Sequence, residues 1–294
     1  EAARDAGLLA PDPSWPGGYR FTHALIRAAR YDRVRPRRRA RLHAALGAAI
    51  LDEYGEGRDL QYLDGAARHL CLGARAGTAE RGIELARRAA DLADASGAAD
   101  LAWAHLDRAV TALSFWPDAP PQLEPELLVE RAVQAEILGE SERAMADFGQ
   151  AFERASDLDD VHLMAAVALA GREGAGTNRS KFWWNPGRAG VDRLVRSFER
   201  LADDASVQLR LDLQFSVGAD GAPYLGEAGA LSWTVRAQEE LDEAMAIGSL
   251  SETDAAGLRL TGLLSRWSQE RPADLVTAFD DIVDAERRRT DVIG

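Results

Sequence analysis

The residues that could do chemistry are few and lie far apart along the chain. The five histidines are His23, His43, His69, His105 and His162. None follows an H-x-x-x-H or H-E-x-x-H spacing, which would place two zinc ligands on one helix face. No G-x-S-x-G elbow is present for a serine nucleophile. The single cysteine, Cys71, excludes an internal disulfide and a multi-cysteine zinc site, and its apolar helix face favours a core position. The sequence therefore predicts no catalytic residue, no metal site and no enzyme.

Pairs of adjacent carboxylates are the next candidates for chemistry. They are Asp159–Asp160, Asp203–Asp204, Glu239–Glu240 and Asp280–Asp281. Two acids can perform acid–base catalysis where their side chains converge in a water-poor cleft. Adjacent residues on a helix point about 100° apart and seldom converge. We expect these acids to lie at the surface or to cap helices.

An aromatic cluster stands in a glycine-rich, basic segment at about 171–190, which breaks the surrounding helical pattern. Because Phe182 and the two tryptophans that follow it are adjacent, they cannot all face one side of a regular element. An exposed tryptophan beside arginine is typical of a recognition patch. The predicted effector or partner patch consists of Arg179, Trp183, Trp184 and Asn185. The alternative is a loop that folds back and caps the helical core.

Charge and hydropathy restrict the class of protein. The formal net charge is −13, which disfavours a broad grip on nucleic acid. Six arginines between residues 33 and 41 form a basic run with no interleaved aromatic residue, and we expect a solvated helix face. No apolar run approaches the 18 residues of a membrane span. These features, with the lone cysteine, predict a cytoplasmic protein.

Helical periodicity dominates the chain. Phe21, Leu25, Ala28 and Tyr31 recur at helical spacing, and Pro36 is suited to open the next helix. Three further apolar stripes follow the same period. They comprise Leu42, Ala45, Leu46, Ala49 and Ile50; Val191, Leu194, Val195, Phe198 and Leu201; and Leu275, Val276, Phe279, Ile282 and Val283.

Only one place indicates strands. Leu8–Leu9 and Tyr19–Phe21 flank a loop rich in proline and glycine at 11–18, which predicts a small two-stranded wing. A second irregular stretch is expected at Gly218–Gly229, which contains Pro223.

Two frames repeat along the chain with glycine at the turn and small residues at the helix crossing. They are Gly97, Ala102, Leu106 and Ala109, and Gly139, Ala144, Phe148 and Ala151, which lie 42 residues apart. The length beyond a 34-residue repeat is assigned to the loop at 114–121. The predicted fold is all-α, a right-handed TPR-like superhelix of stacked helical hairpins. A non-repeating helical bundle is the alternative.

The stretch at 19–43 carries a family resemblance. It reads Tyr19-Arg20-Phe21-Thr22-His23-Ala24-Leu25 and continues to Arg41-Leu42-His43. This pattern resembles the junction between winged helix and helical arm in STAND ATPases, and most closely that of the large ATP-binding LuxR-type transcriptional regulators. Trp184 in a Gly/Asn/Pro loop, the segment Arg236–Ala246 and the segment Asp254–Arg259 agree in kind.

The resemblance implies a division of labour. Residues 1–34 would be the C-terminal part of a winged helix, and 35–294 a TPR-like arm that binds an effector or protein partner. ATP or ADP would bind to an N-terminal P-loop domain, and DNA to a C-terminal helix-turn-helix, both absent here, and no cofactor is expected in this segment. His23 would contact the nucleotide's phosphates in the full-length protein; the alternative is a local hydrogen bond at a helix start.

Other outputs are open at this point. Relatives with cyclase or kinase domains share the same junction, and a generic TPR scaffold would need no nucleotide switch. Homo-oligomerisation is also left open, and no membrane contact is expected.

Overall fold

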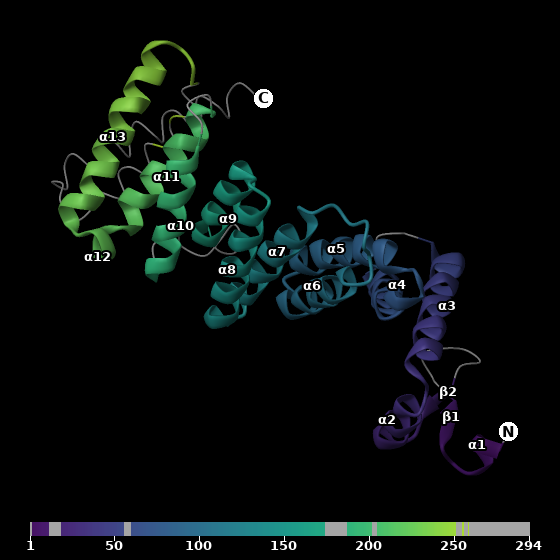
Figure 1. Ribbon diagram of the computed structural model, residues 1–294. Coiled ribbons are helices and arrows are strands. Elements are labelled where there is room, and N and C mark those ends of the chain that lie inside the picture. Colours follow the sequence, from purple (N-terminus) through teal and green to yellow (C-terminus); the bar gives the residue numbers. More distant parts are fainter. Residues whose placement is uncertain are drawn as a thin grey trace, which may run out of the picture. The chain divides into compact units, whose positions relative to one another are not determined.

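The computed structural model describes residues 2–11, 19–55, 60–173, 187–201 and 205–250, together with Ala255 and Leu258. Most of these residues lie in α-helices that pack as successive hairpins, which confirms the predicted all-α class (Figure 1). The chain divides into two compact units, Glu1–Ala119 and Pro120–Gly294, called the N-terminal and C-terminal units below. Their boundary falls within the predicted loop at 114–121. The predicted domain boundary at 34/35 stays a prediction.

The N-terminal unit begins with two short strands and continues as helices. In chain order its elements are α1 (Ala2–Asp5), β1 (Leu9–Pro11), β2 (Tyr19–Phe21), α2 (Ala24–Asp32), α3 (Pro36–Tyr54), α4 (Leu60–Leu72), the 3-10 helix η1 (Ala74–Ala76), α5 (Ala79–Ala95) and α6 (Ala99–Leu113). Within the described part of the chain, no helix is long and apolar enough to cross a membrane.

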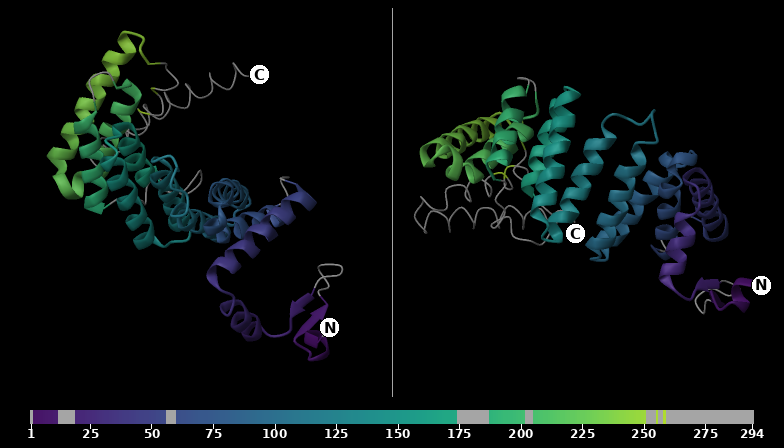
Figure 2. Two further views of the ribbon diagram at one scale, coloured as in Figure 1. Left: turned by 45° about the vertical axis from the view of Figure 1, so that its right-hand side comes forward. Right: turned by 60° about the horizontal axis from the view of Figure 1, so that its bottom comes forward.

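The predicted pair of strands is confirmed, whereas its role as a wing stays a prediction. Strands β1 and β2 pair antiparallel with Leu9 opposite Phe21 and Pro11 opposite Tyr19, and Figure 2 shows them beside α1. The Thr22 hydroxyl donates to the Gly7 carbonyl at 2.8 Å and fixes the exit of β2. Helix α2 contains Leu25, Ala28 and Tyr31 of the predicted helical stripe, whereas Phe21 lies in β2. The helix buries none of its residues, and Leu25 is 84% exposed.

Helices α3, α4 and α5 approach one another through glycines. A Cβ atom on Gly47 would lie 2.6 Å from a Leu70 side-chain carbon, and one on Gly82 would lie 2.7 Å from the Cys71 amide nitrogen. Both distances are shorter than real Cβ contacts, so the helices pack too closely for any larger residue. Pro36 opens α3 in the first turn as predicted.

The apolar stripe predicted for α3 is wrong as a packing face. The helix buries Ala40, His43 and Gly47 instead, because these residues permit the close approach to α4. Leu42 is 50% exposed and Leu46 is 47% exposed. The most hydrophobic side of α3 therefore faces solvent.

Both predicted repeat frames are confirmed in their local geometry. Gly97 and Gly139 each have a φ of +77°, a left-handed conformation that glycine adopts without steric cost. These turns connect the paired helices α5 and α6 in the N-terminal unit, and α7 and α8 in the C-terminal unit. The six remaining frame residues are buried. They are Ala102, Leu106, Ala109, Ala144, Phe148 and Ala151.

The C-terminal unit contains only helices among its described residues. They are α7 (Leu123–Ile137), α8 (Ser141–Asp157), α9 (Val161–Glu173), α10 (Gly187–Arg200), α11 (Val207–Asp220), α12 (Ala222–Leu225) and α13 (Glu227–Ala246). Arg131 on α7 donates two hydrogen bonds to the Asp147 carboxylate on α8, at 2.7 and 2.8 Å, and joins this hairpin.

Two predictions in the C-terminal unit have different outcomes. The stripe at 191–201 is confirmed, with Val191 and Leu194 fully buried on α10. The irregular stretch predicted at Gly218–Gly229 is confirmed only as two interruptions, at Gly221 and at Gly226, which separate the end of α11, the short helix α12 and the start of α13. Pro223 stands in the first turn of α12, where its missing N–H is tolerated. The stripe at 275–283 lies outside the described residues.

We predict that Phe148→Ala destabilises the C-terminal unit by about 3–5 kcal/mol, because its ring is fully buried and its loss leaves a cavity. Leu138→Ala is the control in the same unit, since Leu138 is 40% exposed, and it should cost less than about 1 kcal/mol. Denaturant unfolding followed by circular dichroism measures both. Equal losses for the two variants would contradict the packing described here.

Candidate functional site

His23 is the residue predicted to contact the nucleotide's phosphates in the full-length protein. It is the N-cap residue of α2, directly after β2, with an extended backbone (φ −132°, ψ 129°) and an exposed side chain. The imidazole makes no capping hydrogen bond, so the alternative of a local bond at the helix start gains no support. Its role as a phosphate contact stays a prediction. The predicted patch of Arg179, Trp183, Trp184 and Asn185 lies outside the described residues.

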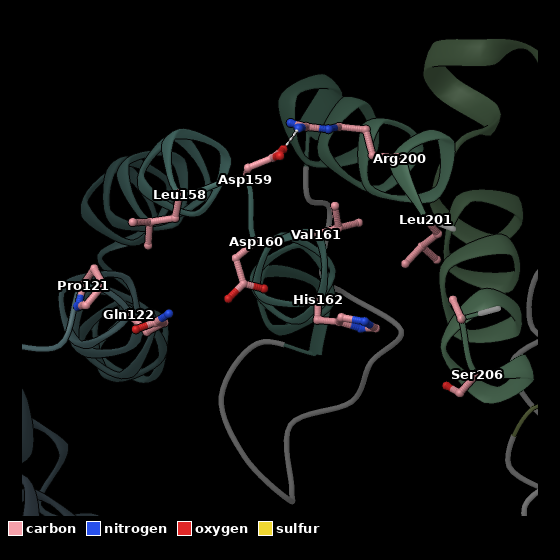
Figure 3. A pocket seen from close by; sticks show the side chains of 11 residues that line it. Pro121, Gln122, Leu158, Asp159, Asp160, Val161, His162, Arg200, Leu201 and Ser206 are labelled. Carbon is pink, nitrogen blue, oxygen red and sulfur yellow. Dashed lines mark hydrogen bonds and ion pairs between the residues drawn. The ribbon is translucent and has the colours of Figure 1, made fainter. Parts of the chain in front are cut away.

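A pocket in the C-terminal unit is formed where helix ends gather (Figure 3). The N-terminal ends of α7, α9 and α11 and the C-terminal ends of α8 and α10 contribute to it. Its volume is about 680 Å³, within the range of small-molecule sites. The lining residues are Pro121, Gln122, Leu158, Asp159, Asp160, Val161, His162, Arg200, Leu201, Ala205 and Ser206.

Ion pairing and capping hold the pocket wall in place. Arg200 on α10 pairs with Asp159, as Figure 3 shows, and donates to the Ser156 hydroxyl at 3.3 Å. Asp159 has a φ of +55°, an uncommon conformation for a residue other than glycine, at the turn between α8 and α9. These contacts join the end of α10 to the α8–α9 turn.

Asp160 and Ser206 in the pocket wall cap helices. For the pair at 159–160, capping by Asp160 and the exposed side chain of Asp159 confirm the expected capping or surface role. The Asp160 carboxylate accepts a hydrogen bond from the Leu163 amide at 2.9 Å. The Ser206 hydroxyl accepts one from the Leu209 amide at 3.3 Å. The other described pair, Glu239 and Glu240, lies in α13, where Glu240 accepts hydrogen bonds from Arg210 and Gln214.

The pocket's polar groups are mixed in charge. Helix N-termini favour anions, but Asp159 and Asp160 stand at the same place and oppose a strongly anionic ligand. His162, in the first turn of α9, lines the same pocket as Gln122 and Arg200. This arrangement suits a small polar molecule with both hydrogen-bond donor and acceptor groups better than a nucleoside triphosphate.

Three residues that the sequence separates come together in the N-terminal unit. The Nδ1 atoms of His43 and His69 lie 2.8 Å apart, and the Tyr31 hydroxyl lies 2.8 Å from His43 Nε2. One Nδ1 must accept the hydrogen bond that the other donates, so at least one ring is neutral. This chain of hydrogen bonds connects α2, α3 and α4.

Burial keeps both imidazoles uncharged. It lowers the pKa of His69 to about 4, with the nearby Arg68 and His43 acting in the same direction. Burial also lowers the pKa of His43, assisted by the charges of Arg68 and Arg39. Among the described residues, no group of three or more His, Cys, Asp or Glu converges to hold a metal. The hydrogen-bonded and stacked rings of His43 and His69 form part of the contact between α3 and α4.

His105 and Cys71 are core residues. His105 is fully buried on α6, and its Nε2 lies 3.1 Å from Asp64 on α4, whose pKa is lowered by that contact. Cys71 is buried on α4, and burial raises the pKa of its thiol to about 12. The burial of Cys71 confirms the expected core position. Because the thiolate is the nucleophilic form, the raised pKa also disfavours a nucleophilic role.

Sequence reasoning missed the pocket and the Tyr31–His43–His69 cluster. Both depend on residues from several helices, and no short spacing marks them. No family model, no curated protein and no solved structure matches this chain. The resemblance at 19–43 therefore stays a prediction.

We predict that acid weakens the N-terminal unit. The unfolded His69 titrates near its ordinary pKa of 6.5, whereas the folded residue titrates near 4, so the unfolded state takes up the proton first. The free energy of unfolding should be fully present above pH 6.5 and fall progressively as the pH drops to about 4. Unfolding monitored by circular dichroism across this range measures the slope.

The matched variants are His69→Gln and His162→Gln, since His162 is exposed in the other unit. His69→Gln should flatten the slope even though it lowers stability at pH 7. His162→Gln should retain the wild-type slope. An unchanged slope in His69→Gln would show that the buried imidazole does not control acid stability.

Proposed function

We propose that this chain is the sensory and coupling arm of an ATP-dependent LuxR-type transcriptional regulator and performs no catalysis itself. One observation carries the proposal. The strand pair β1–β2 leads through α2 into the helical hairpins, and it does so within the stretch at 19–43 that bears the resemblance. A winged helix followed by a helical arm is the order that the resemblance implies.

The pocket between the ends of α7–α11 is the proposed effector site. Its size suits a small molecule, and its walls belong to several helices of one unit. A ligand that binds there contacts the α8–α9 turn and the end of α10 at once. An effector can shift a conformational equilibrium only by its difference in affinity for two states. A change in the spacing of these helices would supply that difference.

The remaining functions would belong to other parts of the regulator. ATP or ADP would bind to a P-loop domain and DNA to a helix-turn-helix, in the cytoplasm. The charge of the chain supports this division, because a net charge of −13 disfavours contact with polyphosphate or DNA. His23 would approach the nucleotide from the wing, where its side chain is exposed.

We predict that the reading frame containing this segment encodes a G-x-x-x-x-G-K-[ST] loop before residue 1. In the full-length protein, His23→Ala should weaken ADP binding about tenfold, because a hydrogen bond to a charged phosphate is lost. Isothermal titration measures this, and His162→Ala should bind ADP as the wild type does. The isolated segment of residues 1–294 should bind neither ATP nor ADP.

Two results would contradict the proposal. A reading frame without a P-loop would leave a helical scaffold that joins protein partners without a nucleotide switch. Tight ADP binding by residues 1–294 alone would place the nucleotide site within this chain.

A further inference from the structure

Helix α3 presents an uncovered face whose residues recur three and four positions apart. It consists of the N-cap residue Arg35 and, within the helix, Arg38, Leu42, Ala45, Leu46, Ala49, Asp52 and Glu53, together called the outer face of α3 below. All of these side chains are exposed, including half of Leu42 and nearly half of Leu46. At about 100° per residue the helical members, from Arg38 to Glu53, span one side of the helix, and Arg35 stands at its N-terminal end. The opposite side, with Ala40, His43 and Gly47, packs in the N-terminal unit.

The outer face is ordered by charge along its length. Arg35 and Arg38 stand at its start, the apolar residues occupy the middle, and Asp52 and Glu53 stand at its end. None of these four charged side chains forms an ion pair or hydrogen bond with another described residue. The first turn of α3 contains no acid and the last turn no base. Both ends therefore oppose the helix dipole, which favours acids at the N-terminus and bases at the C-terminus.

A second α3 in antiparallel orientation would match every part of this face. The arginines of one copy would lie opposite Asp52 and Glu53 of the other, and the two leucines would pack over the small side chains of Ala45 and Ala49. The acids of each copy would also stand beside the positive end of the other helix dipole. A two-fold axis makes such a surface complementary to itself.

Other occupants match only part of the face. An anionic bilayer or a nucleic acid would attract Arg35 and Arg38 but repel Asp52 and Glu53. A partner of uniform charge has the same defect.

We propose that two copies of this chain associate through antiparallel pairing of their α3 helices. This association is independent of the effector site and of the nucleotide role proposed for His23. A helix of 19 residues is about 28 Å long, so one helix pair buries less than a standard protein interface. The dimer is therefore weak, with a dissociation constant on the order of 10 μM.

The test is a charge swap measured by sedimentation equilibrium of the 294-residue chain, from about 1 to 200 μM at low ionic strength, where ion pairs are least screened. The basic-end variant carries Arg35→Glu and Arg38→Glu, and the acidic-end variant carries Asp52→Arg and Glu53→Arg. Each variant alone places like charges opposite each other and should weaken the dimer at least tenfold. The fourfold variant, which carries all four changes, should restore the dissociation constant to within about threefold of wild type.

Recovery in the fourfold variant cannot arise within one chain. Residues 38 and 52 are about 21 Å apart along the helix, beyond the reach of a direct ion pair. A mixture of the basic-end and acidic-end variants should likewise form heterodimers. Leu46→Glu should abolish the dimer, whereas Leu138→Glu, at a residue 40% exposed in the C-terminal unit, should leave it intact. Circular dichroism confirms that each variant is folded.

Three outcomes would overturn the proposal. One is a wild-type chain that stays monomeric up to 200 μM. Another is a dimer that none of the α3 variants affects, or that the fourfold variant fails to restore. The third is a monomer that binds vesicles of anionic lipid and loses this binding in Leu46→Glu, which would assign the face to a membrane surface.

Discussion

Close contact between helices at small residues determines how this chain packs. Ala86, Ala89 and Ala93 on α5 and Ala102 and Ala109 on α6 are all fully buried. Interaxial distance depends on the side chains at the crossing, and alanine or glycine there brings backbones near their minimum separation. Larger residues such as Leu106 then fill the space beside the crossing. A hairpin built this way has little room for a bigger residue at those positions.

The same constraint explains why titratable groups lie between helices. At the α3–α4 contact, Gly47 brings the backbones so close that the rings of His43 and His69 stack with centroids 5.0 Å apart. The two Nδ1 atoms pair with each other and His43 Nε2 pairs with the Tyr31 hydroxyl, so these three nitrogens avoid the cost of a buried polar atom without a partner. Histidine at position 43 is thus part of the packing, and its lowered pKa is a consequence of the close helix contact.

The features that could be predicted from the sequence are local ones. The glycine turn and Ala102, Leu106 and Ala109 lie within one helical hairpin, and β1 and β2 lie close together in the sequence. Hydrophobic periodicity failed for α3, because it ranks leucine above glycine and cannot tell which side lies against a neighbour. The pocket at the ends of α7–α11 and the His43–His69 contact also depend on helix positions, which no short spacing encodes.

The exposure of Leu42 and Leu46 on α3 is interpreted from the neighbours of this helix. Among the described elements α3 packs against α4 and η1. Stacked repeats bury apolar faces against their neighbours and present polar residues where the stack meets water. The outer face of α3 departs from that rule, because it carries Leu42 and Leu46 between groups of opposite charge. Its alanines contribute little to solubility. Exposure of these apolar side chains to water raises the free energy of the chain, and burial against a partner lowers it. The order of the charges along this face is complementary to that of a second α3 helix in antiparallel orientation.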